Sequence, residues 1–307
     1  MKKIKNNTYI SEGHITLGAY RIGPEVLLID SGKSASYLQE EWIDLNTMNI
    51  RYLFNTHGHA DHCAGNRFLV DNHHPIILAP CIEADYIEYP NLKDVYLFGL
   101  TPRSILKDKS IYAAPAPVDQ RVCLNDTSTD IDGSSTTLSL SLDHKDCVFK
   151  IISLKGHSPN MMGIVTPDDI AFLGDVLLSE RHLASAPLVY TYDIADHLNT
   201  LKQLRDFHAN GFVLSHGGYT DDIHLLVASN INNILRASEI ILDLITKYQP
   251  LTLDQLHAKL YHTMGLNEVL LTQQLHRRIL MSHLLYLQEK NVLFIEATEG
   301  VVLLHTL

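Results

Sequence analysis

The sequence predicts an α/β fold followed by a small, mainly helical C-terminal part. Before Gly218, short apolar runs bounded by turn residues alternate with segments whose apolar residues have helical spacing. After Gly218, the pattern changes to long helical stretches that two short strands close. A chain of 307 residues is long enough for one large α/β domain and a small appendage. We therefore expect one domain over residues 1–229 and a second over residues 230–307.

Composition narrows the classes of function. Hydrophobic residues make up 46% of the chain and charged residues 19%, which permits a sizeable core and argues against disorder. The formal net charge of −11 opposes avid nonspecific binding to a phosphate backbone unless a basic patch is segregated. We expect no membrane association, because no stretch reaches the roughly 20 apolar residues of a membrane span.

The first part of the predicted α/β domain combines buried strands with short helices. Strands are expected in three short apolar runs, at residues 26–29, 51–55 and 75–79. Apolar residues at helical spacing follow the first strand, and they predict a helix that Ser34 or Ser36 caps. A further short helix is expected over residues 80–88.

Residues 89–120 have no regular pattern, and several prolines interrupt them. Long irregular segments inside compact domains are often lids or substrate loops, and a solvated connector is the equal alternative. A second β-rich block is expected from Arg121 onward. It comprises a strand, a hairpin, a helix and a last strand, at residues 147–154, 162–173, 193–208 and 212–214.

The C-terminal part has the element order of a winged helix. Residues 223–244 form a long helical pattern, and Thr252 with Gln255 three residues later is a helix start of the capping-box type. A third helix is expected over residues 268–290. Two short strands then follow, at residues 292–295 and 301–304.

A dense group of polar side chains follows the strand at residues 51–55. His57, His59, Asp61 and His62 fall within six residues, and imidazole and carboxylate are ligands of first-row metals. Four such groups with only Gly58 and an alanine between them are difficult to explain as packing. Gly58 is expected to permit a tight backbone path that turns the side chains toward one point.

Other predicted strands also end at residues of metal-ligand type. The residues are Asp30, His57, His157, Asp175 and His216. Sheet-based enzymes place their chemistry at strand ends, because loops there hold side chains on a rigid base. The repetition predicts that these side chains converge on one site.

These residues resemble the signature of the metallo-β-lactamase superfamily. The signature is His-x-His-x-Asp-His, then a distant histidine, a Gly-Asp pair and a last histidine, and all are present in order. Asp30 matches the structural aspartate of the family. The resemblance spans roughly residues 8–218. It implies a four-layer αββα sandwich with the site at one edge of the two sheets.

The resemblance also implies a ligand set for two metal ions. The first ion would be held by His57, His59 and His157, the second by Asp61, His62 and His216, and Asp175 would bridge both. An aspartate at position 175 is similar to the hydroxyacylglutathione hydrolase branch, whereas true β-lactamases usually carry cysteine there. The small helical C-terminal domain also resembles a subgroup in which some members cut single-stranded RNA.

Two divalent ions in such a site can activate water. Ions roughly 3.5–4 Å apart can share one water and lower its pKa from 15.7 to about 7, and the metal-bridging hydroxide then attacks a carbonyl or phosphoryl group. Asp61 is the expected catalytic residue that orients the nucleophile and handles its proton. Nitrogen and oxygen ligands favour zinc, with iron or manganese as alternatives.

A few residues outside the signature are candidate substrate contacts. His182 lies seven residues after Asp175, and Tyr190 and Tyr192 lie in a Pro-flanked loop; packing is the alternative role for all three. Five other histidines are expected at the surface, namely His144, His208, His257, His276 and His283.

Cysteine usage and the start of the chain bear on location. Cys63, Cys81, Cys123 and Cys147 are far apart, form no Cys-x-x-Cys pair and follow no secretory signal. We therefore expect reduced thiols and a cytoplasmic protein. Cys63 is expected to be a small buried thiol rather than a ligand.

Three classes of function remain open. They are a hydrolase of a small thioester or lactone, a phosphodiesterase of single-stranded RNA or DNA, and a metal-stabilised regulatory or binding protein. Residues 230–307 contain six Lys or Arg and seven Asp or Glu residues, and only Arg277-Arg278 is concentrated, whereas a DNA-reading winged helix usually has a basic recognition helix. We therefore expect a small-molecule substrate, and a C-terminal part that edges the active site, packs on the first domain or mediates a homodimer.

Overall fold

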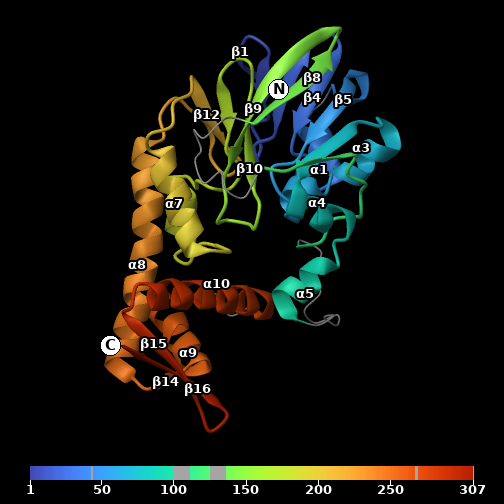
Figure 1. Ribbon diagram of the computed structural model, residues 1–307. Helices are drawn as coiled ribbons and strands as arrows, with labels where there is room; N and C mark the ends of the chain where they lie inside the picture. The colour runs from blue at the N-terminus through green and yellow to red at the C-terminus, as the bar shows by residue number, and fades with distance from the viewer. Residues whose placement is uncertain (43, 100–110, 125–135, 267–268, 307) are drawn as a thin grey trace.

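The computed structural model describes residues 1–42, 44–99, 111–124, 136–266 and 269–306. Two β-sheets form the centre of its N-terminal part (Figure 1). The first sheet has seven strands in chain order: β1 (Lys2–Lys5), β2 (Thr8–Ile10), β3 (Gly18–Ile22), β4 (Glu25–Ile29), β5 (Asn49–Phe54), β6 (Ile76–Pro80) and β7 (Gln120–Val122). Strands β1 to β4 are antiparallel, whereas β4 to β7 pair in parallel. The parallel strands therefore deliver their C-terminal loops to one edge of the sheet.

The second sheet has six strands in the order β13-β12-β11-β10-β9-β8. The strands are β8 (Thr136–Leu142), β9 (Lys145–Ser153), β10 (Met162–Val165), β11 (Ile170–Phe172), β12 (Gly211–Leu214) and β13 (Gly218–Thr220). β11 and β12 are parallel, and the other neighbours are antiparallel. The predicted hairpin of residues 162–173 is the pair β10–β11.

A continuous apolar core joins the two sheets. It contains Phe54 and Leu78 from the first sheet and Phe149, Ile164 and Phe172 from the second. Alternation along β8 buries every second side chain on the inner face. Complete burial of an aliphatic or aromatic side chain of this kind contributes roughly 1.5–3 kcal/mol.

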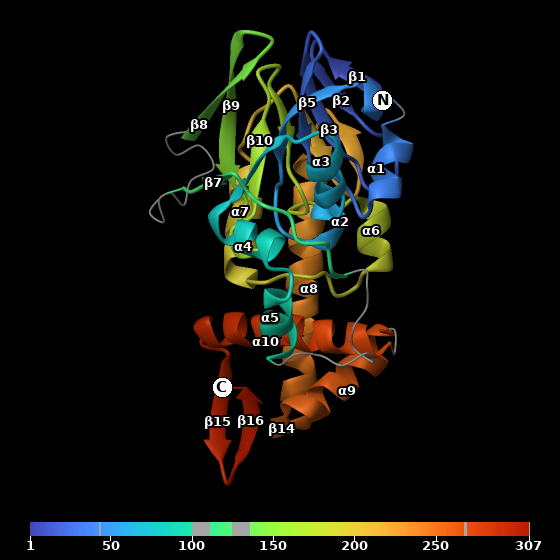
Figure 2. The same ribbon diagram turned by 90° about the vertical axis from the view of Figure 1, so that its right-hand side faces the viewer.

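Helices cover the outer faces of both sheets (Figure 2). The first sheet packs against α1 (Ala35–Glu41) and α3 (Asn66–Asn72), with Trp42 fully buried between them and the sheet. The second sheet packs against α7 (Ile194–Leu204) and α8 (His224–Tyr248). The result is the predicted four-layer αββα sandwich. Shorter helices complete this part, namely a 3-10 turn (Leu45–Thr47), α2 (Ala60–Cys63), α4 (Cys81–Glu88), α5 (Leu92–Phe98) and α6 (Glu180–Ser185).

The C-terminal part has its own apolar core beyond α8. It contains β14 (Leu251–Thr252), α9 (Leu253–Met264), α10 (Leu270–Glu289), β15 (Leu293–Thr298) and β16 (Val301–Thr306), and its sheet has the order β14-β16-β15. Figure 1 shows α10 lying across the molecule from α8 to α5. The C-terminal part therefore reaches back to the loops of the sandwich.

Most predicted elements are present, and the two helix starts agree in detail. Ser34, not Ser36, caps α1 by accepting a hydrogen bond from the Tyr37 amide, and Thr252 and Gln255 form a reciprocal capping box on α9. Two expectations are wrong. Arg121 lies in β7 of the first sheet and does not begin the second, and α5 interrupts the segment of residues 89–120 that was expected to be irregular. Residues 100–110 of that segment lie outside the described residues.

The prediction of four reduced cysteines is also wrong. Cys81 and Cys123 form a disulfide, with a Cα–Cα distance of 5.3 Å. Parallel pairing of Pro80 with Val122, the last residues of β6 and β7, brings together the cysteines that directly follow the two strands, a contact that sequence spacing alone does not reveal. Cys63 and Cys147 are free and buried. The disulfide removes one of the two arguments for a cytoplasmic location.

The predicted surface position of one histidine, His283, differs from the structure. His283 is 2% exposed and contacts Ser238 of α8 through Nδ1 at 2.8 Å, so its predicted surface position is wrong. It lies on the buried face of α10, which explains the difference.

Among the helices in the described segments, none combines the length and hydrophobicity that crossing a bilayer requires.

The burial of His283 predicts a pH-dependent stability. Desolvation lowers its pKa from 6.5 to about 4, so the unfolded chain binds a proton before the folded chain does. Stability should therefore fall as the pH drops from 6.5 toward 4. Between pH 7 and pH 5, the free energy of unfolding in urea should fall about 2 kcal/mol less for His283→Asn, which can keep the Ser238 contact, than for the wild type. The exposed variant His144→Asn should match the wild type, and equal losses for all three proteins would contradict the prediction.

Candidate dinuclear metal centre

The loop after β5 carries four of the seven predicted ligand residues. His57 is fully buried, His59 precedes α2, and Asp61 and His62 lie on that helix. Gly58 is required for a reason other than the predicted backbone freedom, because it does not have a positive φ angle. A Cβ atom there would lie 2.8 Å from the Cβ of Tyr86 and 3.0 Å from the Glu83 carbonyl oxygen, so only glycine lets the loop pack this closely on α4.

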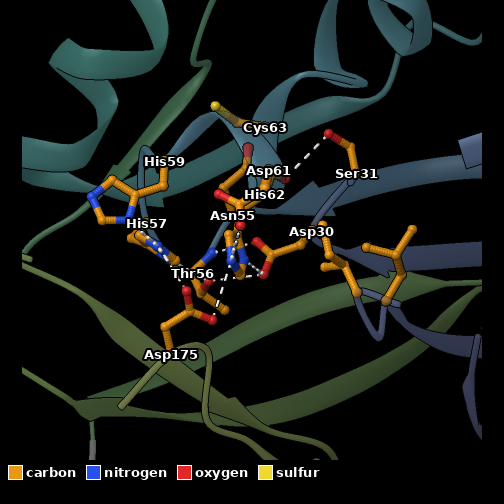
Figure 3. Close-up of polar contacts among 12 residues, drawn as sticks. Asp30, Ser31, Asn55, Thr56, His57, His59, Asp61, His62, Cys63 and Asp175 are labelled. Atoms are coloured by element: carbon orange, nitrogen blue, oxygen red, sulfur yellow. Dashed lines mark hydrogen bonds and ion pairs between the residues drawn. The ribbon is translucent and has the colours of Figure 1, made fainter. Parts of the chain in front are cut away.

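The other three predicted ligands come from the second sheet. His157 follows β9, Asp175 follows β11 and His216 follows β12. Figure 3 shows Asp175 pointing from that sheet toward His57 on the opposite loop. The structure therefore brings together all seven side chains that the sequence analysis selected.

The seven side chains form two groups that share Asp175. In each group, one nitrogen or oxygen atom from every residue lies within 4.8 Å of the others. The first group is His57, His59, His157 and Asp175, and the second is Asp61, His62, His216 and Asp175.

Distances in the first group match a small coordination sphere. The Nδ1 atom of His59 lies 2.9 Å from Nε2 of His57 and 3.1 Å from Nε2 of His157. Asp175 Oδ2 lies 3.9 Å from the former Nε2 atom and 3.6 Å from the latter. Ligands on tetrahedral zinc with bonds of 2.0–2.1 Å are about 3.3–3.4 Å apart, within the observed range.

The second group has the same spacing. His62 Nε2 lies 3.2 Å from Asp175 Oδ1, and His216 Nε2 lies 3.4 Å from both Asp175 Oδ2 and Asp61 Oδ2. Although His62 Nε2 and Asp175 Oδ1 are close, their geometry is not that of a hydrogen bond, and neither buried atom has a hydrogen-bond partner among the residues that the structure describes. Because unpaired buried polar atoms are costly, this observation fits an ion between them. The cluster is therefore compatible with two divalent metal ions.

Asp30 orients the cluster from behind. Its carboxylate accepts hydrogen bonds from the amide and hydroxyl of Thr56, each at 2.8 Å, and contacts Nδ1 of His62 at 2.8 Å (Figure 3). The contact assigns the proton to Nδ1 and turns the Nε2 lone pair of His62 toward the site. Asp30 has a φ of 58°, a left-handed conformation that aspartate tolerates better than most residues.

Glu83 of α4 joins the two loops that carry the first group. Its buried carboxylate accepts hydrogen bonds from the Gly58 amide at 2.9 Å, the Asn160 amide at 2.9 Å and the Ser158 hydroxyl at 2.7 Å. Burial raises the pKa of Glu83, and these three donors partly offset that effect. The sequence analysis did not select Glu83, although it follows the predicted strand at residues 75–79 as the ligands follow theirs.

Charge within the cluster is divided between two sets of histidines. Burial lowers the pKa of His57, His59 and His157, which keeps them neutral with a lone pair free for a metal. Burial also opposes charge on His62 and His216, but neighbouring carboxylates, Asp175 foremost, overcome it. They raise the pKa of His62 well above its usual range and that of His216 to about 10. Bound divalent cations would take the place of such protons.

A cavity of about 270 Å³ opens beside the first group. His59, Asp61, His157 and Asp175 form its polar floor, and its walls come from several elements, namely Tyr86 of α4, Lys93 of α5, Ile111, Pro159, Tyr190 and Leu275 of α10. The C-terminal part therefore contributes directly to the wall of this cavity.

The three predicted substrate contacts lie in different places. Tyr190 lines the cavity, with its ring centroid 5.3 Å from that of His59. His182 lies on the other side of the cluster, 5.4 Å from the His216 ring, in a separate depression that it shares with His14. Tyr192 is 46% exposed and lies in a groove against α10, outside the cavity.

The fold and the site together define the class of protein. The family model described as the Metallo-beta-lactamase superfamily matches residues 18–216, and the chain belongs to this superfamily. A comparison with curated proteins found no match.

Solved structures with the same fold match most or all of the chain. A metallo-beta-lactamase family protein from Thermus thermophilus aligns over 98% of this chain and 99% of its own, with a TM-score of 0.69 and 16% identity. A beta-lactamase domain protein from Burkholderia ambifaria covers 99% of this chain and 93% of its own, with a TM-score of 0.65 and 15% identity. A metallo-beta-lactamase from Pontibacter korlensis covers 76% of this chain and 97% of its own, with a TM-score of 0.53 and 14% identity. At these identities, the likeness concerns the fold alone.

The role of Asp30 can be tested by replacing its carboxylate. Asp30→Asn keeps the size of the side chain but weakens the hydrogen bonds to Thr56 and His62, so zinc affinity should fall roughly 10–100-fold. Competition of a chromophoric chelator for zinc measures this change. Asp71→Asn, on the exposed end of α3, is the matched control and should bind as the wild type does. Unchanged affinity in Asp30→Asn would show that the carboxylate does not orient the site.

Proposed function

We propose that this protein is a dinuclear metal-dependent hydrolase of small ester-type substrates, either thioesters or lactones. The sharing of Asp175 by the two ligand groups carries the proposal, because paired ions are the arrangement that activates water at neutral pH. Within the proposal, the first ion is held by His57, His59 and His157, the second by Asp61, His62 and His216, and Asp175 contacts both. Nitrogen and oxygen donors favour zinc over softer ions.

Two metal ions held by these residues would supply a water of lowered pKa and would polarise the scissile carbonyl. The side chains transfer the proton, position the substrate and limit the access of water. Asp61 Oδ2 faces His216 and is the carboxylate best placed to accept and return a proton at the site. Tyr190 and Leu275 limit the access of bulk water and position the substrate.

Two observations support a small substrate over a nucleic acid. The cavity beside the ligands has about 270 Å³, close to the lower end of the ~300–1,000 Å³ typical of small-molecule sites. In addition, Leu275 of α10 closes part of it, and the C-terminal part lacks a concentrated basic surface apart from Arg277-Arg278 in its sequence. Asp175 in place of cysteine supports the hydroxyacylglutathione hydrolase-like branch rather than a true β-lactamase.

The C-terminal residues complete the proposal. We infer that residues 230–307 form a winged-helix-like domain, which the sheet order β14-β16-β15 beside three helices supports. The division from residues 1–229 falls within α8, which links the two domains. In this protein the domain acts as a wall of the active site rather than as a reader of nucleic acid.

The ligand assignment can be tested by substitution. Asp175→Ala and His59→Ala should each lower the bound zinc and reduce turnover of the best substrate in a panel of thioesters and lactones by roughly a thousandfold or more, since each loses metal catalysis worth several kcal/mol. Atomic emission measures the metal, and circular dichroism confirms folding. The exposed His144→Ala is the control. Wild-type turnover in either site variant would refute the assignment.

A further inference from the structure

Lys93 places a buried cation in the wall of the cavity. It is 5% exposed and lies in the first turn of α5, where it lines the cavity with His59 and Asp175. It is the only lysine or arginine among the described residues that line this cavity. Most of the wall around it is aromatic or aliphatic. A charge in such surroundings is costly unless it has a partner.

Within the described residues, Lys93 has little to compensate its charge. Its Nζ atom donates one hydrogen bond, to the carbonyl oxygen of Ile111 at 3.3 Å, although an ammonium group has three donors. No carboxylate in the described part of the chain lies within ion-pair distance of it. Glu83 also lines the cavity and interacts with Lys93 only through longer-range electrostatics, because its carboxylate accepts three hydrogen bonds from the ligand loops. Asp94, the next residue in the chain, accepts a hydrogen bond from the Tyr112 hydroxyl.

A purely structural role does not explain this lysine. The first turn of a helix has a partial positive charge, so a cation there is unfavourable for the helix. An uncharged residue of similar length would fill the same space without the cost of desolvation. The buried position of Lys93 is therefore explained by an anion that binds in the cavity.

We propose that Lys93 binds a carboxylate on the substrate, so that the substrates are small thioesters or lactones with an acidic group away from the scissile carbonyl. This inference rests on the proposed function, because the metal pair is taken to hold the carbonyl end. A single ammonium among apolar walls suits a monoanion, whereas a phosphate group generally requires several converging donors. The carboxylate would complete the hydrogen bonding of Nζ and neutralise its charge.

The proposal can be tested by binding, without any substrate being identified. Glutarate and adipate would present one carboxylate to the zinc ions and a second to Lys93, whereas pentanoate and hexanoate replace the second carboxylate by a methyl group. Calorimetry on the zinc-loaded protein at fixed ionic strength should show the better diacid binding roughly 10–100-fold more tightly than the monoacid of equal length, the range expected for a charged hydrogen bond. Lys93→Met, which keeps the length of the side chain, should remove this preference.

A control variant and the outcomes that would overturn the proposal complete the test. Lys202→Met removes an exposed lysine of α7 and should keep the full preference, which separates a local contact from a change in net charge. Equal binding of diacid and monoacid in the wild type, a preference that survives in Lys93→Met, or no diacid binding at all would overturn the proposal. Failure of the proposed hydrolase activity gives a different result, because the diacid preference would then persist while no ester in the panel is hydrolysed.

Discussion

The placement of Asp175 among four imidazoles is the constraint on which the site depends. Its carboxylate oxygens lie 3.2–3.9 Å from nitrogen atoms of His57, His62, His157 and His216. Such a cluster of imidazoles around one buried carboxylate can be stabilised either by protons or by metal cations. The lack of a hydrogen bond at His62 Nε2 and at Asp175 Oδ1, within the described residues, favours cations. The proposed activation of water depends on cations, rather than protons, occupying this cluster.

The sandwich fold holds the side chains of the site in fixed positions. The parallel strand β5 of the first sheet leads into the loop of His57 to His62, and β9, β11 and β12 of the second sheet lead to the remaining candidate ligands. Asp30 and Glu83 then fix the loops through hydrogen bonds to Thr56, Gly58 and Ser158. Because the core between the sheets is continuous, the two halves of the site have little freedom to move apart.

Much of this arrangement could be predicted from sequence, because ligand residues at strand ends and apolar periodicity are local signals. The capping box at Thr252 and the convergence of the seven side chains agree with those signals, and the αββα layers agree with what the family resemblance implied. Contacts between distant segments that carry no recognisable motif could not be predicted. The Cys81–Cys123 pair depends on the partnership of β6 and β7, and the wall residue Leu275 depends on how α10 crosses toward α5. Lys93 belongs to the same class, since only its burial beside the metal ligands makes it notable.

The positions of bound metal ions test the role of Asp175 most directly. Crystals of the zinc-loaded protein, measured with X-rays on both sides of the zinc absorption edge, would locate them by anomalous scattering. We predict two peaks roughly 3.5–4 Å apart with Asp175 between them, each about 2.0–2.2 Å from the ligand atoms of its own group. A site without anomalous signal, or zinc bound only elsewhere on the molecule, would contradict the central claim.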